Sequence, residues 1–197
     1  MITGIACEAM PLASPMRNAY ISFAAMTTSV VAVHDDAGLV GYGFNSNGRY
    51  DQCGILRSRL IPRLLAAPPD QVLDGEGRVD PEAAWGVMLA DEKPGGHGDR
   101  AVAAGAVDMA LWDLAAKEAA VPLPHLLAGR YAWAPPEEAV AVYAAGGYYY
   151  PDRGEEALAE ELRGYLDRGY TRVKMKVGGA PVDTDRRRVE AALDVVG

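Results

Sequence analysis

Lys174 and Lys176, separated by one residue in the sequence VKMKVGG, are the side chains best suited to chemistry. On a strand, alternate residues share a face, so both lysines point one way. The apolar residues Val173, Met175 and Val177 then point the other way, toward covering helices. Two ammonium groups roughly 6–7 Å apart disfavour each other's charge, which lowers a lysine pKa toward the value that a general base needs. The alternative is an edge strand with solvated lysines that oppose aggregation.

The elements expected around these lysines follow a parallel β-α-β-α order. Residues 139–145 predict a short buried strand, 155–168 an amphipathic helix and 172–177 a second strand. A further helix, capped by Asp183, is expected to bury Val189, Ala192, Leu193 and Val196. Parallel α/β folds place their sites at the carboxyl ends of strands, where this chain has glycines, and this favours a functional role for the lysines.

The earlier part of the chain predicts an antiparallel meander with helices. Residues 35–38 supply turn chemistry between two segments rich in β-branched residues. The expected strands are 2–10, 25–34 and 39–44, and the expected helices are 52–65, 81–89 and 99–119, the last capped by Asp99 and buried on two sides. The Ala-Pro-Pro sequence in 131–137 is typical of a linker, which gives two domains, 1–133 and 134–197.

The glycine-rich segment 91–100 is a second candidate for ligand binding. It lacks a preceding strand and a Gly-Lys-Ser/Thr sequence, so nucleotide binding is disfavoured. It could instead bring Lys93 or His97 to an anion, or serve as a plain flexible connection. The three histidines and two cysteines have no metal-ligand spacing, and no serine-hydrolase motif occurs.

Composition excludes several partner classes. Lys plus Arg is 19 against 27 Asp plus Glu, and the resulting net charge of −8 argues against nucleic-acid binding. No run approaches the ~20 apolar residues of a membrane span, and the first residues lack the features of a secretory signal. Two cysteines, Cys7 and Cys53, are too few for a disulfide framework. We therefore expect a protein of a reducing compartment, the cytoplasm, with no membrane partner.

Two motifs carry a resemblance to a known family. The segment AVDMALWDLAAK (106–117), followed by VPL (121–123) and LLAG (126–129), resembles the cap-domain helix region of the enolase superfamily. Lys174-Met175-Lys176 looks like the Lys-x-Lys motif of its mandelate racemase and muconate lactonizing branches. The resemblance implies an α+β cap domain followed by the first two βα units of a (β/α)₈ TIM-like barrel, which takes ~250 residues in full.

The resemblance also implies a chemistry. The family's common step is abstraction of the proton α to a carboxylate, giving an enediolate held by Mg²⁺, as in enolase-type sites. Lys176 would be the base, and Lys174 would lie beside the substrate carboxylate and add positive charge where the enediolate forms. The metal ligands and a histidine general acid are expected on later barrel strands beyond Gly197, so the chain needs a C-terminal barrel remainder as its partner.

Three loop segments narrow the resemblance. Residues 45–50, 93–100 and 143–150 resemble D-tartrate dehydratase and its relatives, which implies a hydro-lyase acting on a small carboxylate substrate, an acid sugar or tartrate. The substrate-binding residues would be Lys93, Tyr20, Asn45 and Ser46. The alternatives are a racemase, cycloisomerase or epimerase of the same superfamily, or a fragment that acts only as a binding module. We expect a homo-oligomer.

Overall fold

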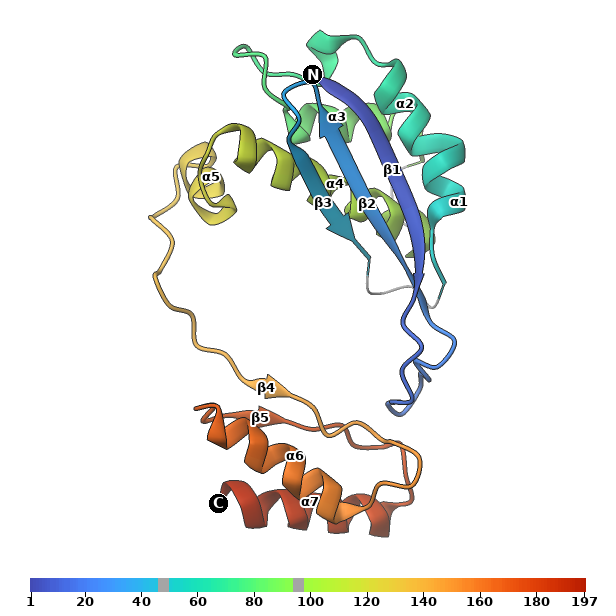
Figure 1. The fold of residues 1–197 in the computed structure, drawn as a ribbon, viewed down its shortest axis with the longest axis vertical. Helices are drawn as coiled ribbons and strands as arrows, with labels where there is room; N and C mark the ends of the chain where they lie inside the picture. The colour runs from blue at the N-terminus through green and yellow to red at the C-terminus, as the bar shows by residue number, and fades with distance from the viewer. Residues whose placement is uncertain (46–49, 94–97) are drawn as a thin grey trace. The chain divides into compact units, whose positions relative to one another are not determined.

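The computed structural model describes residues 1–45, 50–93 and 98–197 (Figure 1). By its contacts the chain divides into two compact units, and each is described by itself. The first unit contains Met1–Leu12 and Met26–Pro136, and the second contains Ala13–Ala25 and Glu137–Gly197. The expected domain boundary after Trp133 lies close to this division, whereas the separation of residues 13–25 from their sequence neighbours has no counterpart in the expected ranges.

The first unit is built on a three-stranded antiparallel sheet in the order β1-β2-β3. The strands are β1 (Ile2–Pro11), β2 (Thr27–Asp35) and β3 (Val40–Phe44). Alternate residues of β2 are buried, among them Val31 and Val33, because one face of the sheet packs against helices. The turn between β2 and β3 contains Gly38 at φ 83°, a conformation that glycine adopts without strain. The predicted meander is confirmed.

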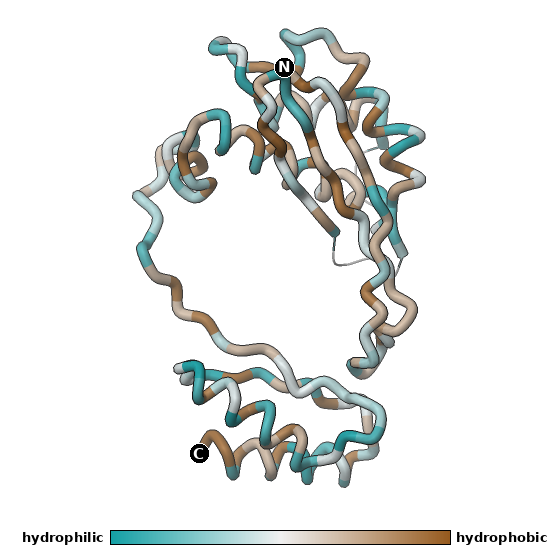
Figure 2. The backbone as a smooth tube through the Cα atoms, viewed as in Figure 1, coloured by the Kyte–Doolittle hydropathy of each residue, from teal (hydrophilic) through white to brown (hydrophobic). Residues whose placement is uncertain are grey.

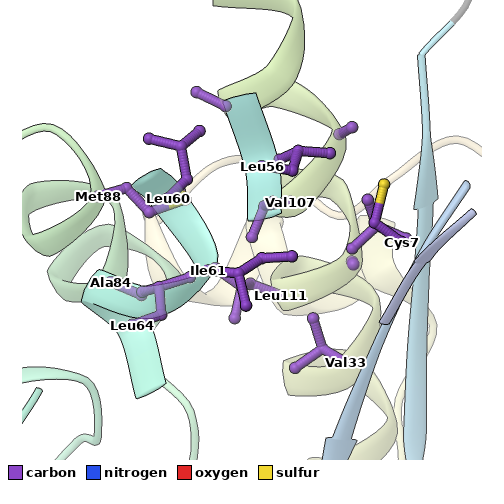
Figure 3. Packing of buried hydrophobic residues seen from close by; sticks show 14 of the residues in the cluster. Cys7, Val33, Leu56, Leu60, Ile61, Leu64, Ala84, Met88, Val107 and Leu111 are labelled. Carbon is purple, nitrogen blue, oxygen red and sulfur yellow. The ribbon is translucent and has the colours of Figure 1, made fainter. Parts of the chain in front are cut away.

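Helices cover the sheet face that carries Val31 and Val33 (Figure 1). They are α1 (Cys53–Ile55), a π-helical turn η1 (Leu56–Leu60), α2 (Ile61–Ala66), a 3₁₀ turn η2 (Pro69–Gln71), α3 (Pro81–Met88) and α4 (Gly98–Glu118), and α5 (Leu123–Arg130) follows and contacts α4. The predicted stripe of Leu56, Leu60 and Leu64 is buried in full, as Figure 3 shows. Helix α5 was not among the expected elements, and none of its residues is fully buried: Leu123, Leu126 and Leu127 share one side of it and are half-buried.

Helix α4 lies directly against strand β3. A Cβ atom at Gly41 would collide with the carbonyl oxygen of Ala110, and one at Gly43 with that of Ala106. The small side chains of α4 therefore face the sheet, and the helix is buried between layers as predicted. One detail differs: Asp99, expected to cap this helix, lies inside the first turn of α4.

Cys7 of β1 and Cys53 of α1 are joined by a disulfide across 46 residues of sequence. Both residues are buried in the core of the first unit, where β1 and α1 pack together, and Figure 3 shows Cys7 among its neighbours. The pairing runs against the expectation of a reducing compartment, which rested on these two cysteines being too few for a disulfide framework. Two cysteines suffice for one bond, and tertiary packing brings them together.

The second unit has the predicted β-α-β-α order: β4 (Ala144–Ala145), α6 (Glu155–Asp167), β5 (Val173–Lys174) and α7 (Val182–Val196). The two strands pair in parallel. Helices α6 and α7 lie side by side on one side of the strands (Figure 1), and their teal and brown residues alternate as amphipathic helices require (Figure 2). The apolar cluster between them contains Leu158, Leu162 and Ala192.

Two predictions for the second unit are wrong in detail. The strand expected over 139–145 pairs only at its last two residues, and Val140 and Val142 are 72% and 62% exposed. Of the residues expected on the buried face of α7, Ala192 is buried, whereas Val189, Leu193 and Val196 are exposed. The buried position one turn before Ala192 is occupied instead by Arg188.

Candidate active site

The two lysines lie on a short parallel ladder that extends beyond β4 and β5. Gly146 N donates to the carbonyl oxygen of Lys174 at 2.9 Å, and Lys176 N donates to that of Gly147 at 3.2 Å. Val173 and Met175 pack against the apolar cluster of α6 and α7. Alternation along the strand therefore places Lys174 and Lys176 on the opposite face, as predicted.

Each lysine lies over a tyrosine ring. Lys174 Nζ is 5.7 Å from the ring centroid of Tyr143, and Lys176 Nζ is 5.1 Å from that of Tyr148. The ring of Tyr148 in turn meets Phe23 edge to face at 5.8 Å. Cations are attracted to aromatic faces at these distances, so the rings orient both ammonium groups. Lys174 is exposed and Lys176 is half-buried.

Val177 does not follow the predicted pattern. It is 55% exposed and is absent from the apolar cluster that Val173 and Met175 contact. Gly178, the next residue, has φ 87°, so the extended backbone ends directly after Val177. The alternation of the strand therefore ends at Lys176.

A tyrosine and an aspartate join the loops that follow β4 and β5. Tyr149 Oη donates to Asp185 Oδ1 at 2.6 Å and accepts from Gly179 N at 3.0 Å. Gly178 N donates to Asp185 Oδ2 at 2.6 Å. Burial, followed by the hydrogen bond to Asp185, raises the pKa of Tyr149 above its ordinary value. Tyr149 and Asp185 were not among the predicted site residues, although the sequence does place Asp185 in the first turn of a helix after the glycines.

The segment 13–25 belongs to the second unit through the loop after β4. Arg17 and Tyr149 exchange two main-chain hydrogen bonds, each of 2.9 Å, and the Arg17 guanidinium lies 5.5 Å from the Tyr149 ring centroid. Tyr20, one of the predicted substrate-binding residues, is 96% exposed on this segment. Its side chain is thus accessible to a ligand, and its binding role stays a prediction.

The other predicted substrate-binding residues belong to the first unit. Asn45 is buried: its Oδ1 accepts from Thr28 Oγ1 at 2.8 Å and from Ser29 N at 2.7 Å. Asn45 directly follows β3, and its hydrogen bonds join the end of that strand to β2. Lys93 is exposed, and its carbonyl oxygen accepts from Arg100 at 2.9 Å. Ser46 lies outside the described residues. The binding roles of Asn45, Lys93 and Ser46 stay predictions.

Two kinds of feature are absent from the described ranges 1–45, 50–93 and 98–197. No three His, Cys, Asp or Glu residues in these ranges gather into a group that could hold a metal ion. The described residues therefore do not fit a magnesium site by themselves. No helix in these ranges is long and apolar enough to cross a membrane.

Comparisons with known proteins agree with this architecture. Residues 1–128 match the model of the mandelate racemase / muconate lactonizing enzyme N-terminal domain. Arabinonate dehydratase of Saccharolobus solfataricus is 29% identical over 162 residues, which cover 81% of this chain and 40% of that protein. N-succinyl-L-Arg/Lys racemase of Bacillus cereus is 27% identical over 195 residues, which cover 95% of this chain and 46% of that protein.

A solved structure matches the whole chain. The crystal structure of a racemase from Streptomyces coelicolor A3(2) with bound magnesium superimposes with a TM-score of 0.75 at 26% identity, covering 100% of this chain and 52% of that one. The chain thus spans about half the length of the proteins it matches, or less. The chain belongs to the mandelate racemase / muconate lactonizing enzyme family of the enolase superfamily, whose N-terminal domain it contains.

Proposed function

We propose that the whole protein is a hydro-lyase that dehydrates a sugar acid, with Lys176 as the base that takes the proton α to the substrate carboxylate. The observation that carries the proposal is the pair of lysines on the face of β5 opposite Val173 and Met175. Lys174 then lies beside the substrate carboxylate, where its charge favours the anion that forms. The similarity to arabinonate dehydratase supports a sugar acid as the substrate.

The proposed reaction begins with a proton transfer. The Cα proton passes to the neutral amine of Lys176, and the C–H electron pair moves into the carboxylate. The electrons then return to form a carbon–carbon double bond as the β-hydroxyl takes a proton and leaves as water, and the resulting enol becomes a 2-keto acid. The acid that protonates the hydroxyl is expected in the barrel remainder. Magnesium dependence is proposed for the whole protein, with the metal ligands in the barrel remainder, because no cluster among the described residues fits Mg²⁺.

We propose tartrate as the narrower substrate, with oxaloacetate as its product and with Tyr20, Lys93, Asn45 and Ser46 as the residues that bind it. The proposal rests on the resemblance that the sequence of segments 45–50, 93–100 and 143–150 carries. The 29% identity with arabinonate dehydratase supports the broader class of sugar acids.

A racemase is the second candidate. The match to N-succinyl-L-Arg/Lys racemase covers 95% of this chain, more than the match to arabinonate dehydratase does. A racemase also begins by removing the proton α to a carboxylate, but it returns a proton to the same carbon and releases no water. The product therefore separates the two functions, whereas the role of Lys176 is common to both.

The test uses the full-length protein with Mg²⁺ and a panel of arabinonate, gluconate, galactonate, tartrate and N-succinyl amino acids. We expect formation of a 2-keto acid from a sugar acid, read by semicarbazone absorbance, and exchange of the α proton in D₂O, read by proton NMR. Lys176→Met is expected to abolish both while the circular dichroism spectrum stays unchanged. Lys117→Met, at a lysine of the first unit, is the matched control and should retain exchange.

Three outcomes count against parts of the proposal. Racemisation without a keto product would replace the hydro-lyase with a racemase. Normal α-proton exchange in Lys176→Met would remove Lys176 from the base role. Turnover of other sugar acids but not of tartrate would end the narrower assignment.

We also propose a cytoplasmic location and a homo-oligomeric state for the whole protein. The disulfide between Cys7 and Cys53 bears on the location, because disulfides are rare in cytosolic proteins. Alkylation of free thiols in freshly lysed cells, read by mass spectrometry, tests the location, and light scattering tests the assembly. Alkylation of both cysteines would support a cytoplasmic location. A protein in which neither cysteine is alkylated would count against it.

A further inference from the structure

Arg188 is a buried cation on a helix of the second unit. It is 6% exposed, whereas the side chains of its neighbours Arg186 and Arg187 on α7 are 67% and 54% exposed. Removing a guanidinium from water is costly unless hydrogen bonds and opposite charges compensate for the loss. The contacts of Arg188 therefore indicate what its burial achieves.

The guanidinium of Arg188 holds the loop that follows β4. Its Nη2 donates to the carbonyl oxygen of Gly147 at 2.7 Å, and its central carbon lies 4.4 Å from the ring centroid of Tyr149. Its Nε lies 3.7 Å from Asp185 Oδ1 and has no hydrogen-bond partner among the described residues. Arg188 thus donates a hydrogen bond to a main-chain carbonyl, that of Gly147, in a loop next to the candidate site.

The carbonyl that Arg188 holds is also the acceptor for Lys176. The Lys176 main-chain N donates to Gly147 O at 3.2 Å, and one carbonyl oxygen can accept both bonds through its two lone pairs. Gly147 itself has little freedom to move. Its φ is +59°, and an added Cβ would lie 2.6 Å from Met175 Cβ.

The chain just after Lys176 is held by the same helix. Asp185, one turn before Arg188 on α7, accepts from Gly178 N at 2.6 Å and from Tyr149 Oη at 2.6 Å. Lys176 therefore lies between two main-chain points that α7 fixes, the Gly147 oxygen and the Gly178 nitrogen. Its ammonium group rests over Tyr148, the neighbour of the tyrosine that Arg188 stacks against.

We propose that Arg188 is a positioning residue for Lys176. By holding the Gly147 carbonyl and the Tyr149 ring, it sets the direction in which the Lys176 amine is presented. Arg188 acts through Gly147 and Tyr149 and touches no reacting atom. The catalytic consequence rests on the proposed role of Lys176 as a base, whereas the structural consequence, a fixed Lys176, can be measured without any substrate.

The first arm of the test measures Lys176 directly in the full-length protein. Lysines are reductively methylated with ¹³C-formaldehyde, the Lys176 signal is assigned by its loss in Lys176→Arg, and main-chain hydrogen exchange at Lys176 is followed by mass spectrometry. Loss of a hydrogen bond from a charged donor is expected to speed this exchange about tenfold or more in Arg188→Met and to move the methyl signal. Arg186→Met is the matched control on the same helix and should change neither.

Two further variants keep the test decisive. Arg188→Lys retains a charged donor for the Gly147 carbonyl, so it should partly restore slow exchange. Tyr149→Phe keeps the ring over Arg188 and loses the bonds to Asp185 and Gly179, so it should show a smaller effect in the same direction. If Arg188→Met does not fold, these two variants carry the comparison alone.

The second arm measures α-proton exchange with the substrate that the panel of acids identifies. A positioning role predicts that kcat falls about tenfold or more in Arg188→Met while KM stays within about twofold, with partial rescue in Arg188→Lys. The proposal is overturned if Arg188→Met has the wild-type rate of amide exchange and the wild-type methyl signal. If Arg188→Met does not fold, wild-type values in both Arg188→Lys and Tyr149→Phe overturn it. A disturbed Lys176 in a protein whose wild type turns over no substrate would instead count against the proposed function alone.

Discussion

The two units of this chain are held together in different ways. The first buries a large apolar cluster around Leu56, Leu60 and Leu111 and adds a disulfide. In the second, the buried cluster consists of Leu158, Leu162 and Ala192, with half-buried side chains around it. Its loops are fixed by hydrogen bonds to charged groups of α7. Apolar burial is non-directional, whereas hydrogen bonds fix distance and angle. The unit that carries the candidate base thus has the smaller apolar cluster, and hydrogen bonds to α7 set the positions of its loops.

The largest expected effect is the loss of the disulfide that strengthens the first unit. Cys7 and Cys53 are 46 residues apart, and closing a loop of that length stabilises the folded state by about 4 kcal/mol through the entropy of the unfolded chain. Reductant should lower the free energy of unfolding of the first unit by about that amount. Urea unfolding followed by tryptophan fluorescence measures it, because all three tryptophans lie in the first unit.

The control is a Cys7→Ala/Cys53→Ala double variant, whose unfolding should not respond to reductant. Equal stability of the wild type with and without reductant, at confirmed thiol content, would contradict the expectation. The two units would then differ in stability only through the size of their apolar clusters, with no contribution from the disulfide.

The next effect is a difference: the cost of Leu→Ala at Leu111 of the first unit minus its cost at Leu162 of the second, two leucines that are both fully buried. Leu→Ala substitutions cost about 2–5 kcal/mol, and the cost depends on how far the surroundings collapse into the cavity. We expect Leu111→Ala to fall near the upper end and Leu162→Ala near the lower end, because a small cluster between two helices can close up. Hydrogen exchange of peptides from α4 and α6 reports the stability of each unit separately. A larger loss of stability in Leu162→Ala than in Leu111→Ala would contradict the expectation.

The smallest effect is a dependence on alkaline pH that arises from one tyrosine of the second unit. Burial, followed by a hydrogen bond to Glu161, raises the pKa of Tyr165 to about 12 from 10.0. The folded state therefore keeps the phenol proton at pH values where the unfolded chain has lost it. This contribution to stability is complete below pH 10 and is lost as pH rises from 10 toward 12.

Tyr165→Phe should remove this part of the slope, whereas Tyr20→Phe, at an exposed ring, should not. Hydrogen exchange of α6 peptides at pH 9 to 12 is too fast to follow, so the measurement is unfolding by circular dichroism in a series of alkaline buffers. Identical slopes for wild type and Tyr165→Phe would contradict the expected shift.

Local patterns in the sequence predict much of this fold. Strand alternation is a local property, so it correctly places Lys174 and Lys176 opposite Val173 and Met175. The four-residue spacing of Leu56, Leu60 and Leu64 likewise predicts a buried helical stripe.

The features that sequence patterns miss depend on tertiary contacts. The burial of Arg188 depends on a carbonyl 41 residues away, and an arginine on an amphipathic helix is ordinarily assigned to solvent. The Cys7–Cys53 bond and the pairing of Arg17 with Tyr149 join segments that only packing brings together. The chemical role of the lysines is predicted from the family resemblance. Their position on one face of the strand is predicted from the alternation of residues.

The close approach of β3 to α4 makes Gly41 and Gly43 behave as core residues without contributing apolar area. Any side chain there must push a helix away from a sheet along its whole length, so alanine, the mildest replacement, is already too large. A saturation mutational scan would therefore rank these two glycines beside the buried leucines. A design that replaces small buried residues with larger apolar ones to gain stability would therefore unfold the first unit if it changed Gly41 or Gly43.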